Sequence, residues 1–88
     1  MMAGLRAKYR TRLARESEAL DVAEGARDRE ALLRIAHGLA GSAGTFGFPR
    51  ISEAAQEAEA ALDLGKPDPD VARAVRRIRA EIASALDD

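Results

Sequence analysis

The chain has 88 residues, and its 14 Lys and Arg side chains nearly balance its 15 Asp and Glu side chains. This length allows one domain with a modest core, and the balanced charge gives no reason to expect binding to nucleic acid or to a membrane surface. The absence of Cys excludes disulfides and thiolate metal sites, and no segment has the roughly 20 apolar residues that a membrane-spanning helix needs. We expect a single cytoplasmic domain over residues 1–88.

The spacing of apolar residues predicts four helices and no strand, over residues about 3–22, 29–46, 49–64 and 69–86. The first helix places Tyr9 and Leu13 on one side together with Leu5, and Gly25 ends the region. The second helix follows Asp28, a good N-cap residue. Gly47 is a plausible residue for the turn after its C-terminus.

The third helix starts at Pro49, a residue suited to the first helical position. The fourth opens with Asp68 and Pro69, and its apolar residues recur at spacings of four and three from Val71 to Leu86. Short connections between helices favour antiparallel neighbours. The predicted fold class is therefore all-α, an antiparallel up-down-up-down four-helix bundle, and we expect a monomer because one bundle buries these apolar stripes.

The only histidine, His37, is followed by a cluster of glycines. Gly38, Gly41 and Gly44 fall within the second predicted helix, where each costs about 1 kcal/mol relative to Ala. His37 points about 160° away from the centre of the apolar stripe, and Gly41 and Gly44 lie within about 40° of it. This pattern indicates that a bulky partner approaches an exposed His37 from outside; the alternative is an ordinary surface histidine.

Glu59 is a candidate partner for His37. His37 lies about ten residues before the turn between the second and third helices, and Glu59 lies about eleven after it, so an antiparallel pair places them at nearly the same height. A carboxylate there would accept a hydrogen bond from one ring nitrogen, fix the tautomer and raise the nucleophilicity of the other nitrogen. The alternative is that Glu59 is a solvated acid like Glu53 and Glu57.

The segment from His37 to Gly47 reads HGLAGSAGTFG. It resembles the motif H-x-L-K-G-[SA]-[SA]-x-x-hydrophobic-G of the histidine-containing phosphotransfer (HPt) domains of two-component phosphorelays. The residues before His37 look like the usual lead-in to this motif, and the similarity continues through the third helix. The resemblance thus covers close to the whole chain and implies a four-helix bundle whose exposed histidine carries a phosphoryl group.

The resemblance implies roles for several residues in and near the motif. His37 would be the phosphoacceptor, and Gly41 would clear room for a receiver domain, with Gly38, Gly44 and Ala40 on the same docking surface. Glu59 falls where some members have a Glu bonded to the histidine. The expected partners are response-regulator receiver domains and a sensor or hybrid histidine kinase, and the Mg²⁺ would belong to the receiver.

One position departs from the family pattern. The family usually has Lys three residues after the histidine, and this chain has Ala40. Arg34 lies one turn before His37, about 60° round the helix, and could supply the missing charge, since Arg binds phosphate through two parallel N–H bonds. The alternative is that Arg34 is a solvated surface residue.

Two further features leave alternatives open. The first helix carries a basic run that either steers an acidic partner or forms a solvated face: Arg6, Lys8, Arg10, Arg12 and Arg15.

No glycine-rich phosphate loop follows a strand, so we expect a carrier without kinase activity, with no cofactor or metal site of its own. A docking module that carries no phosphate, or a helical dimerisation domain, are the alternatives.

Overall fold

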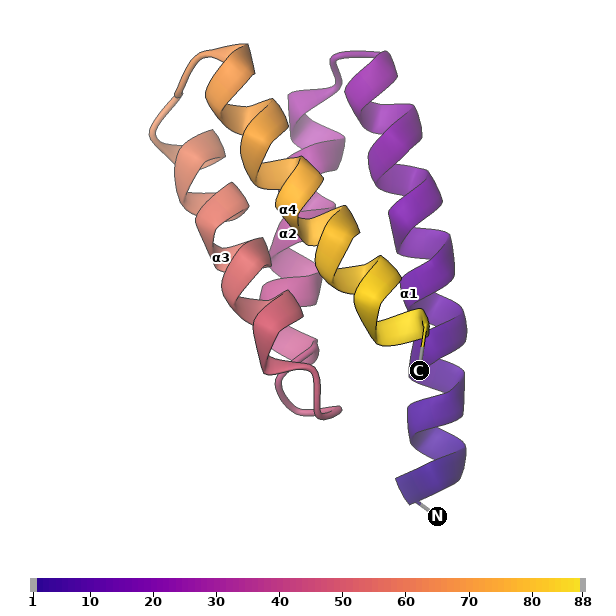
Figure 1. Cartoon of the computed structure of the whole chain (residues 1–88). Helices are drawn as coiled ribbons and strands as arrows, with labels where there is room; N and C mark the ends of the chain where they lie inside the picture. The colour runs from indigo at the N-terminus through magenta and orange to yellow at the C-terminus, as the bar shows by residue number, and fades with distance from the viewer. Residues whose placement is uncertain (1, 88) are drawn as a thin grey trace.

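A computed structural model describes residues 2–87, and the side chains of residues 4–87, as four helices. They are α1 (Met2–Gly25), α2 (Arg29–Ser42), α3 (Pro49–Asp63) and α4 (Asp68–Leu86). Successive helices run antiparallel, α1 and α3 each pack against both α2 and α4, and the first turns of α1 extend beyond the bundle (Figure 1). The predicted four-helix fold is confirmed, and within the described residues there is no strand.

The core consists of the apolar stripes that the sequence predicts. Large side chains from all four helices are almost fully buried: Leu13, Leu20, Leu39, Ile51, Val75, Ile78 and Ile82. One predicted core residue is wrong, because Leu5 is 49 % exposed. It lies near the N-terminal end of α1, which extends past the other helices (Figure 1), so no neighbouring helix covers it.

The N-terminus of α2 is capped as the sequence predicts. The backbone N–H of Ala31 donates to Oδ1 of Asp28 over 3.1 Å. The C-terminus differs from the prediction, since the regular helix ends at Ser42 and residues 43–47 form turns. Gly44 therefore lies after the helix, so the propensity cost expected for it inside a helix does not arise. Phe46, in these turns, stacks on Tyr9 of α1, with ring centroids 4.5 Å apart, a contact that local apolar spacing cannot reveal.

The three helix–helix connections close with the same pair of backbone bonds. After α2, the N–H of Phe48 donates to the carbonyl of Ala43 and that of Gly47 to the carbonyl of Gly44. This is the Schellman arrangement, which requires a left-handed residue, and Gly47 supplies it with a φ of 90°. Gly65 does the same after α3. α1 ends at Gly25, as predicted, and the left-handed residue of the turn after it is Arg27, at a φ of 54°.

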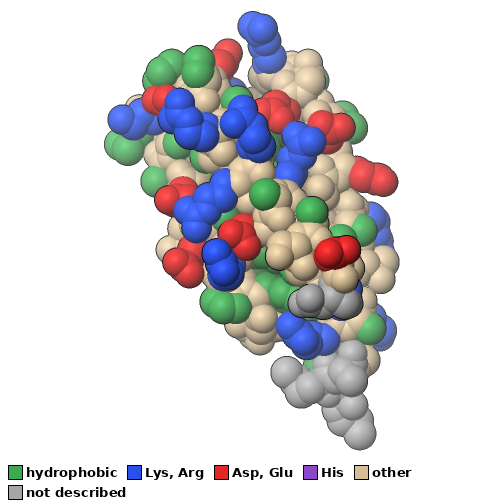
Figure 2. All heavy atoms as spheres, in the orientation of Figure 1, with side chains coloured by type: hydrophobic (Ala, Val, Ile, Leu, Met, Phe, Trp, Pro, Cys, Tyr) green, Lys and Arg blue, Asp and Glu red, His purple; other side chains and the backbone are tan. Residues whose placement is uncertain are grey.

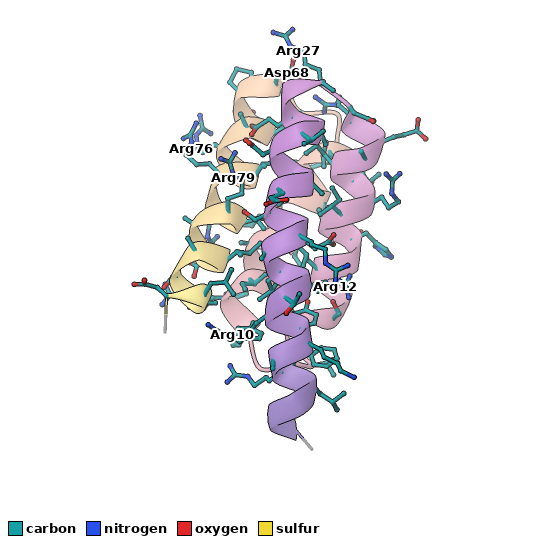
Figure 3. All side chains as sticks on the ribbon, turned by 90° about the vertical axis from the view of Figure 1, so that its right-hand side faces the viewer. Arg10, Arg12, Arg27, Asp68, Arg76 and Arg79 are labelled. Atoms are coloured by element: carbon teal, nitrogen blue, oxygen red, sulfur yellow. The ribbon has the colours of Figure 1, made fainter. Side chains whose placement is uncertain are left out.

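Arginines tie α1 to the rest of the bundle. Nη1 of Arg10 donates to the carbonyl of Ala85 over 2.7 Å, at the C-terminal end of α4. Nη1 of Arg79, on α4, lies 3.3 Å from Asp21 and 3.2 Å from Glu24 on α1. Figure 3 shows Arg10 and Arg79 at different heights of the α1–α4 pair, so their contacts fix the offset of α1 as well as its distance from α4.

The surface of α3 and α4 carries charges of both signs. In Figure 2 basic and acidic side chains are interspersed over this face, and no histidine is visible on it. Across residues 2–87, none of the helices combines the length and the apolar character needed to cross a membrane.

Candidate functional site

His37 lies on the outer surface of α2. Its side chain is 79 % exposed, whereas Leu32, Ile35 and Leu39 of the same helix are buried in the core. This orientation follows from the 3.6-residue period, which places His37 nearly opposite the apolar stripe. The imidazole is accordingly held by the helix backbone but open to a partner, and the predicted exposure of His37 is confirmed.

Glu59 of α3 contacts the imidazole directly. Its Oε2 lies 2.5 Å from Nδ1 of His37, and its side chain is 26 % exposed. An ionised carboxylate only accepts hydrogen bonds, so Nδ1 must carry the proton and donate it. In the neutral ring the lone pair then lies on Nε2, which is directed away from α3. The sequence left Glu59 open as a solvated acid or as a partner of His37, and the geometry shows a partner.

Small residues let α2 and α3 approach closely enough for this contact. Ala54, Ala55 and Ala58 of α3 are fully buried. Ser52, also buried, donates from Oγ to the carbonyl of Ala40 on α2 over 2.8 Å. This bond ties the two helices together one or two turns from the His37–Glu59 pair. Ser52 was missed at the sequence level, because nothing local distinguishes it from an exposed serine.

The side chains around the imidazole include several acids and one arginine. His37 and Glu59 line an open depression of about 370 Å³ together with Glu30, Leu33, Arg34 and Asp63. Arg34 is exposed, and among the side chains of residues 4–87 it has no ion-pair partner. Arg34 therefore lies exposed one helical turn from His37, and this placement fits both a phosphate partner and a solvated surface residue.

The glycines near His37 differ in what surrounds them. A Cβ added to Gly41 would have nothing within 4 Å, so this position is open to a partner. A Cβ on Gly38 would lie 3.2 Å from Nη2 of Arg12, and one on Gly44 would lie 3.9 Å from Ser52. The space at Gly38 is thus shared with a side chain of α1. Ala40 is half-buried against the core.

Some arginines of the basic run on α1 stabilise the fold, and another reaches toward the site. Nε of Arg6 donates to the carbonyl of Phe46 over 3.2 Å, and its Cζ lies 4.5 Å above the Phe48 ring. Arg10 caps α4. These two arginines hold the fold together and were not distinguishable in the sequence from Arg12, which reaches α2. Arg12 was therefore missed as an individual candidate, because the direction of its side chain depends on how α1 packs.

The described acidic and imidazole side chains are too dispersed to form a metal site. In the part of the chain that the structure describes, no three His, Cys, Asp or Glu side chains are grouped so that they could hold a metal ion. The His37–Glu59 pair offers one imidazole and one carboxylate. In this arrangement the carboxylate orients the ring, and Nε2 is left with a lone pair that can act as a nucleophile.

In a comparison with family models, the chain matches the Hpt domain over residues 2–88. No curated protein and no solved structure matches the chain. The match covers almost the full sequence, and it agrees with the four-helix bundle and with the exposed histidine on α2. The chain belongs to the Hpt domain family, whose members are phosphocarriers in two-component signalling and work with receiver and kinase partners.

Proposed function

We propose that His37 accepts a phosphoryl group from the aspartyl phosphate of a receiver domain and returns it to a receiver. The observation that carries this proposal is the pairing of a 79 % exposed imidazole with a carboxylate at Nδ1. That pairing presents the lone pair of Nε2 to the partner. Phosphoryl transfer depends mostly on positioning and on stabilisation of charge, and a rigid helix pair supplies the positioning.

The transfer step needs no group that removes a proton from Nε2. The lone pair of Nε2 attacks phosphorus, the N–P bond forms, and the P–O bond to the receiver's carboxylate breaks, so that the carboxylate leaves with the electron pair. The phosphorylated ring keeps its proton on Nδ1 and becomes positively charged. Glu59, already hydrogen-bonded to Nδ1, then stabilises that charge. Mg²⁺ would be supplied by the receiver, and this chain would contribute no cofactor.

Arg34 is the proposed charge partner for the phosphoryl group on its own helix. It lines the depression that contains His37, and a guanidinium binds phosphoryl oxygens through two parallel N–H bonds. Replacement by Ala is expected to shorten the lifetime of phosphohistidine or to slow transfer. A phosphohistidine lifetime and transfer rate equal to those of the unmodified protein would reject this role.

The docking surface is proposed to centre on Gly41. The space around this residue is open, and Gly38, Ala40 and Gly44 lie on either side of it along the chain. A receiver domain, and the receiver of a hybrid kinase, would bring its acidic site onto this surface. We propose a cytoplasmic location for the chain, as is usual for Hpt domains.

The test is transfer of label from a phosphorylated receiver domain to this protein and to His37→Gln. Acid-labile label on the unmodified protein, and none on the variant, is the expected result. Label on both proteins would place the phosphoryl group elsewhere and overturn the assignment of His37.

A second candidate is a docking module that binds a receiver or a kinase without carrying phosphate. The observation that favours it is Ala40, which stands where most of the family has Lys. Binding of receivers without any labelling of His37 would support this alternative, whereas labelling would reject it.

A further inference from the structure

Arg12 of α1 lies beside the residue that follows His37 in the chain. A Cβ added to Gly38 would be 3.2 Å from Nη2 of Arg12, and Figure 3 shows the Arg12 side chain directed from α1 toward α2. Consecutive Cα atoms are about 3.8 Å apart, so the guanidinium is also close to the backbone of His37. It uses the space that a side chain at position 38 would take.

Two contacts within α1 hold the guanidinium at this height. Its Cζ lies 5.5 Å from the centre of the Tyr9 ring, and Nη2 lies 3.8 Å from Oε2 of Glu16. Tyr9 is itself fixed to α2, because its hydroxyl bonds Oγ of Ser42 over 2.8 Å and Ser42 donates to the carbonyl of Gly38 over 2.7 Å. The side chain of Arg12 is nevertheless 44 % exposed and accessible to a ligand.

The N–H donors of Arg12 are still available. Among residues 4–87 the guanidinium makes no hydrogen bond, and its pair with Glu16 is long for a charge-assisted one. A guanidinium offers five N–H donors in a planar fork that matches phosphoryl oxygens. The free donors beside His37 would be satisfied by an anion on Nε2.

The direction of the imidazole favours an approach from α1. Nδ1 is bonded to Glu59 on α3, so Nε2 is directed away from α3. Gly38 lies about 100° round the helix from His37 toward α1, whereas Ala40 lies about 60° round toward α3. We propose that Arg12 contacts the phosphoryl group on His37 and adds, from α1, to the charge proposed for Arg34 on α2, so that the two arginines together replace the Lys found elsewhere in the family, with Gly38 as the opening that lets Arg12 approach. This proposal rests on the proposed function of His37.

The experiment phosphorylates the intact protein with phosphoramidate, a small donor that requires no docking surface. Nε2 of His37 attacks phosphorus, the N–P bond forms, and the bond from phosphorus to the amine breaks as ammonia leaves. The rate of phosphohistidine formation is followed by ³¹P NMR. We expect Arg12→Ala to lower this rate about three- to tenfold, because it removes a charge that stabilises the transferring group, and Arg12→Lys to restore most of it.

Arg76→Ala is the matched control for charge. Arg76 is exposed on α4 and has no ion-pair partner in the described part of the chain. In Figure 3 it projects away from α2. This variant changes the net charge by the same amount and should label at the rate of the unmodified protein. Thermal unfolding of each variant shows whether the fold is retained.

Gly38→Leu tests the opening itself, since its side chain would fill the space that the guanidinium uses. It should slow labelling when Arg12 is present and have no further effect when combined with Arg12→Ala. Labelling of folded Arg12→Ala at the rate of Arg76→Ala would overturn the role of Arg12 while leaving the proposed function intact. A lack of label on His37 in the unmodified protein would overturn both.

Discussion

The Nδ1–carboxylate bond fixes the orientation of the His37 ring. The Glu59 carboxylate fixes the tautomer and holds the ring by a 2.5 Å bond, while most of the imidazole stays in solvent. Without this bond the ring would rotate about its side-chain torsions, and either nitrogen could carry the proton. The orientation of Nε2 is therefore determined jointly by α2 and α3.

Glu59→Ala is expected to slow phosphorylation of His37 about tenfold. A hydrogen bond to a charged group contributes about 1.5 kcal/mol, and 1.36 kcal/mol corresponds to a factor of ten in rate. The measurement is the single-turnover transfer rate from a phosphorylated receiver. Glu57→Ala is the control: Glu57 lies two residues away on α3 and pairs with Arg77 of α4, so its loss should not change the rate. Equal rates for the two variants would argue against an orienting role for Glu59.

Among the connections between helices, the one after α1 differs from the other two in the residue type at its left-handed position. Gly47 and Gly65 have a positive φ after α2 and α3, but Arg27 has a φ of 54° after α1. A left-handed conformation costs an L-residue with a Cβ roughly 1–2 kcal/mol. Arg27 projects into solvent at the end of the bundle (Figure 3) and no side-chain bond holds it within the described structure. The strain at this position is not offset by a contact of its own.

Arg27→Gly is expected to stabilise the protein by about 0.5–1 kcal/mol, the left-handed strain minus the extra backbone entropy of Gly. Tm should rise by several degrees for a domain of this size, as measured by circular dichroism. Arg27→Ala keeps the Cβ and loses the charge, so it should give no such rise. An increase in Tm of the same size in both variants would mean that the charge, and not the conformation, destabilises this turn.

For the whole molecule, stability depends on a small core rich in alanine. Leu39 is fully buried on α2, whereas Leu64 is 73 % exposed after α3. Leu39→Ala should lower the free energy of unfolding by about 2–5 kcal/mol, a large part of the total for a small domain. Leu64→Ala should change it by no more than about 0.5 kcal/mol. Urea denaturation measures both, and similar losses for the two variants would contradict the proposed position of the core.

The four helices, their buried faces and the exposure of His37 could be predicted from the sequence. These features depend on local quantities: the 3.6-residue period of Leu32, Ile35 and Leu39, the cap at Asp28 and the proline at the start of α3. A helix that buries one stripe must expose the opposite one. The exposure of His37 was therefore predictable before any tertiary contact was known.

Which charged groups meet at the site follows from the way the helices pack together. The contact of Glu59 with Nδ1 and the position of Arg12 over Gly38 depend on the relative rotation and offset of helices distant in the sequence. The same is true of the early end of α2, where Phe46 stacks on Tyr9. Rotation and offset are set by close packing of the whole core, and a periodic pattern within one helix contains no information about them.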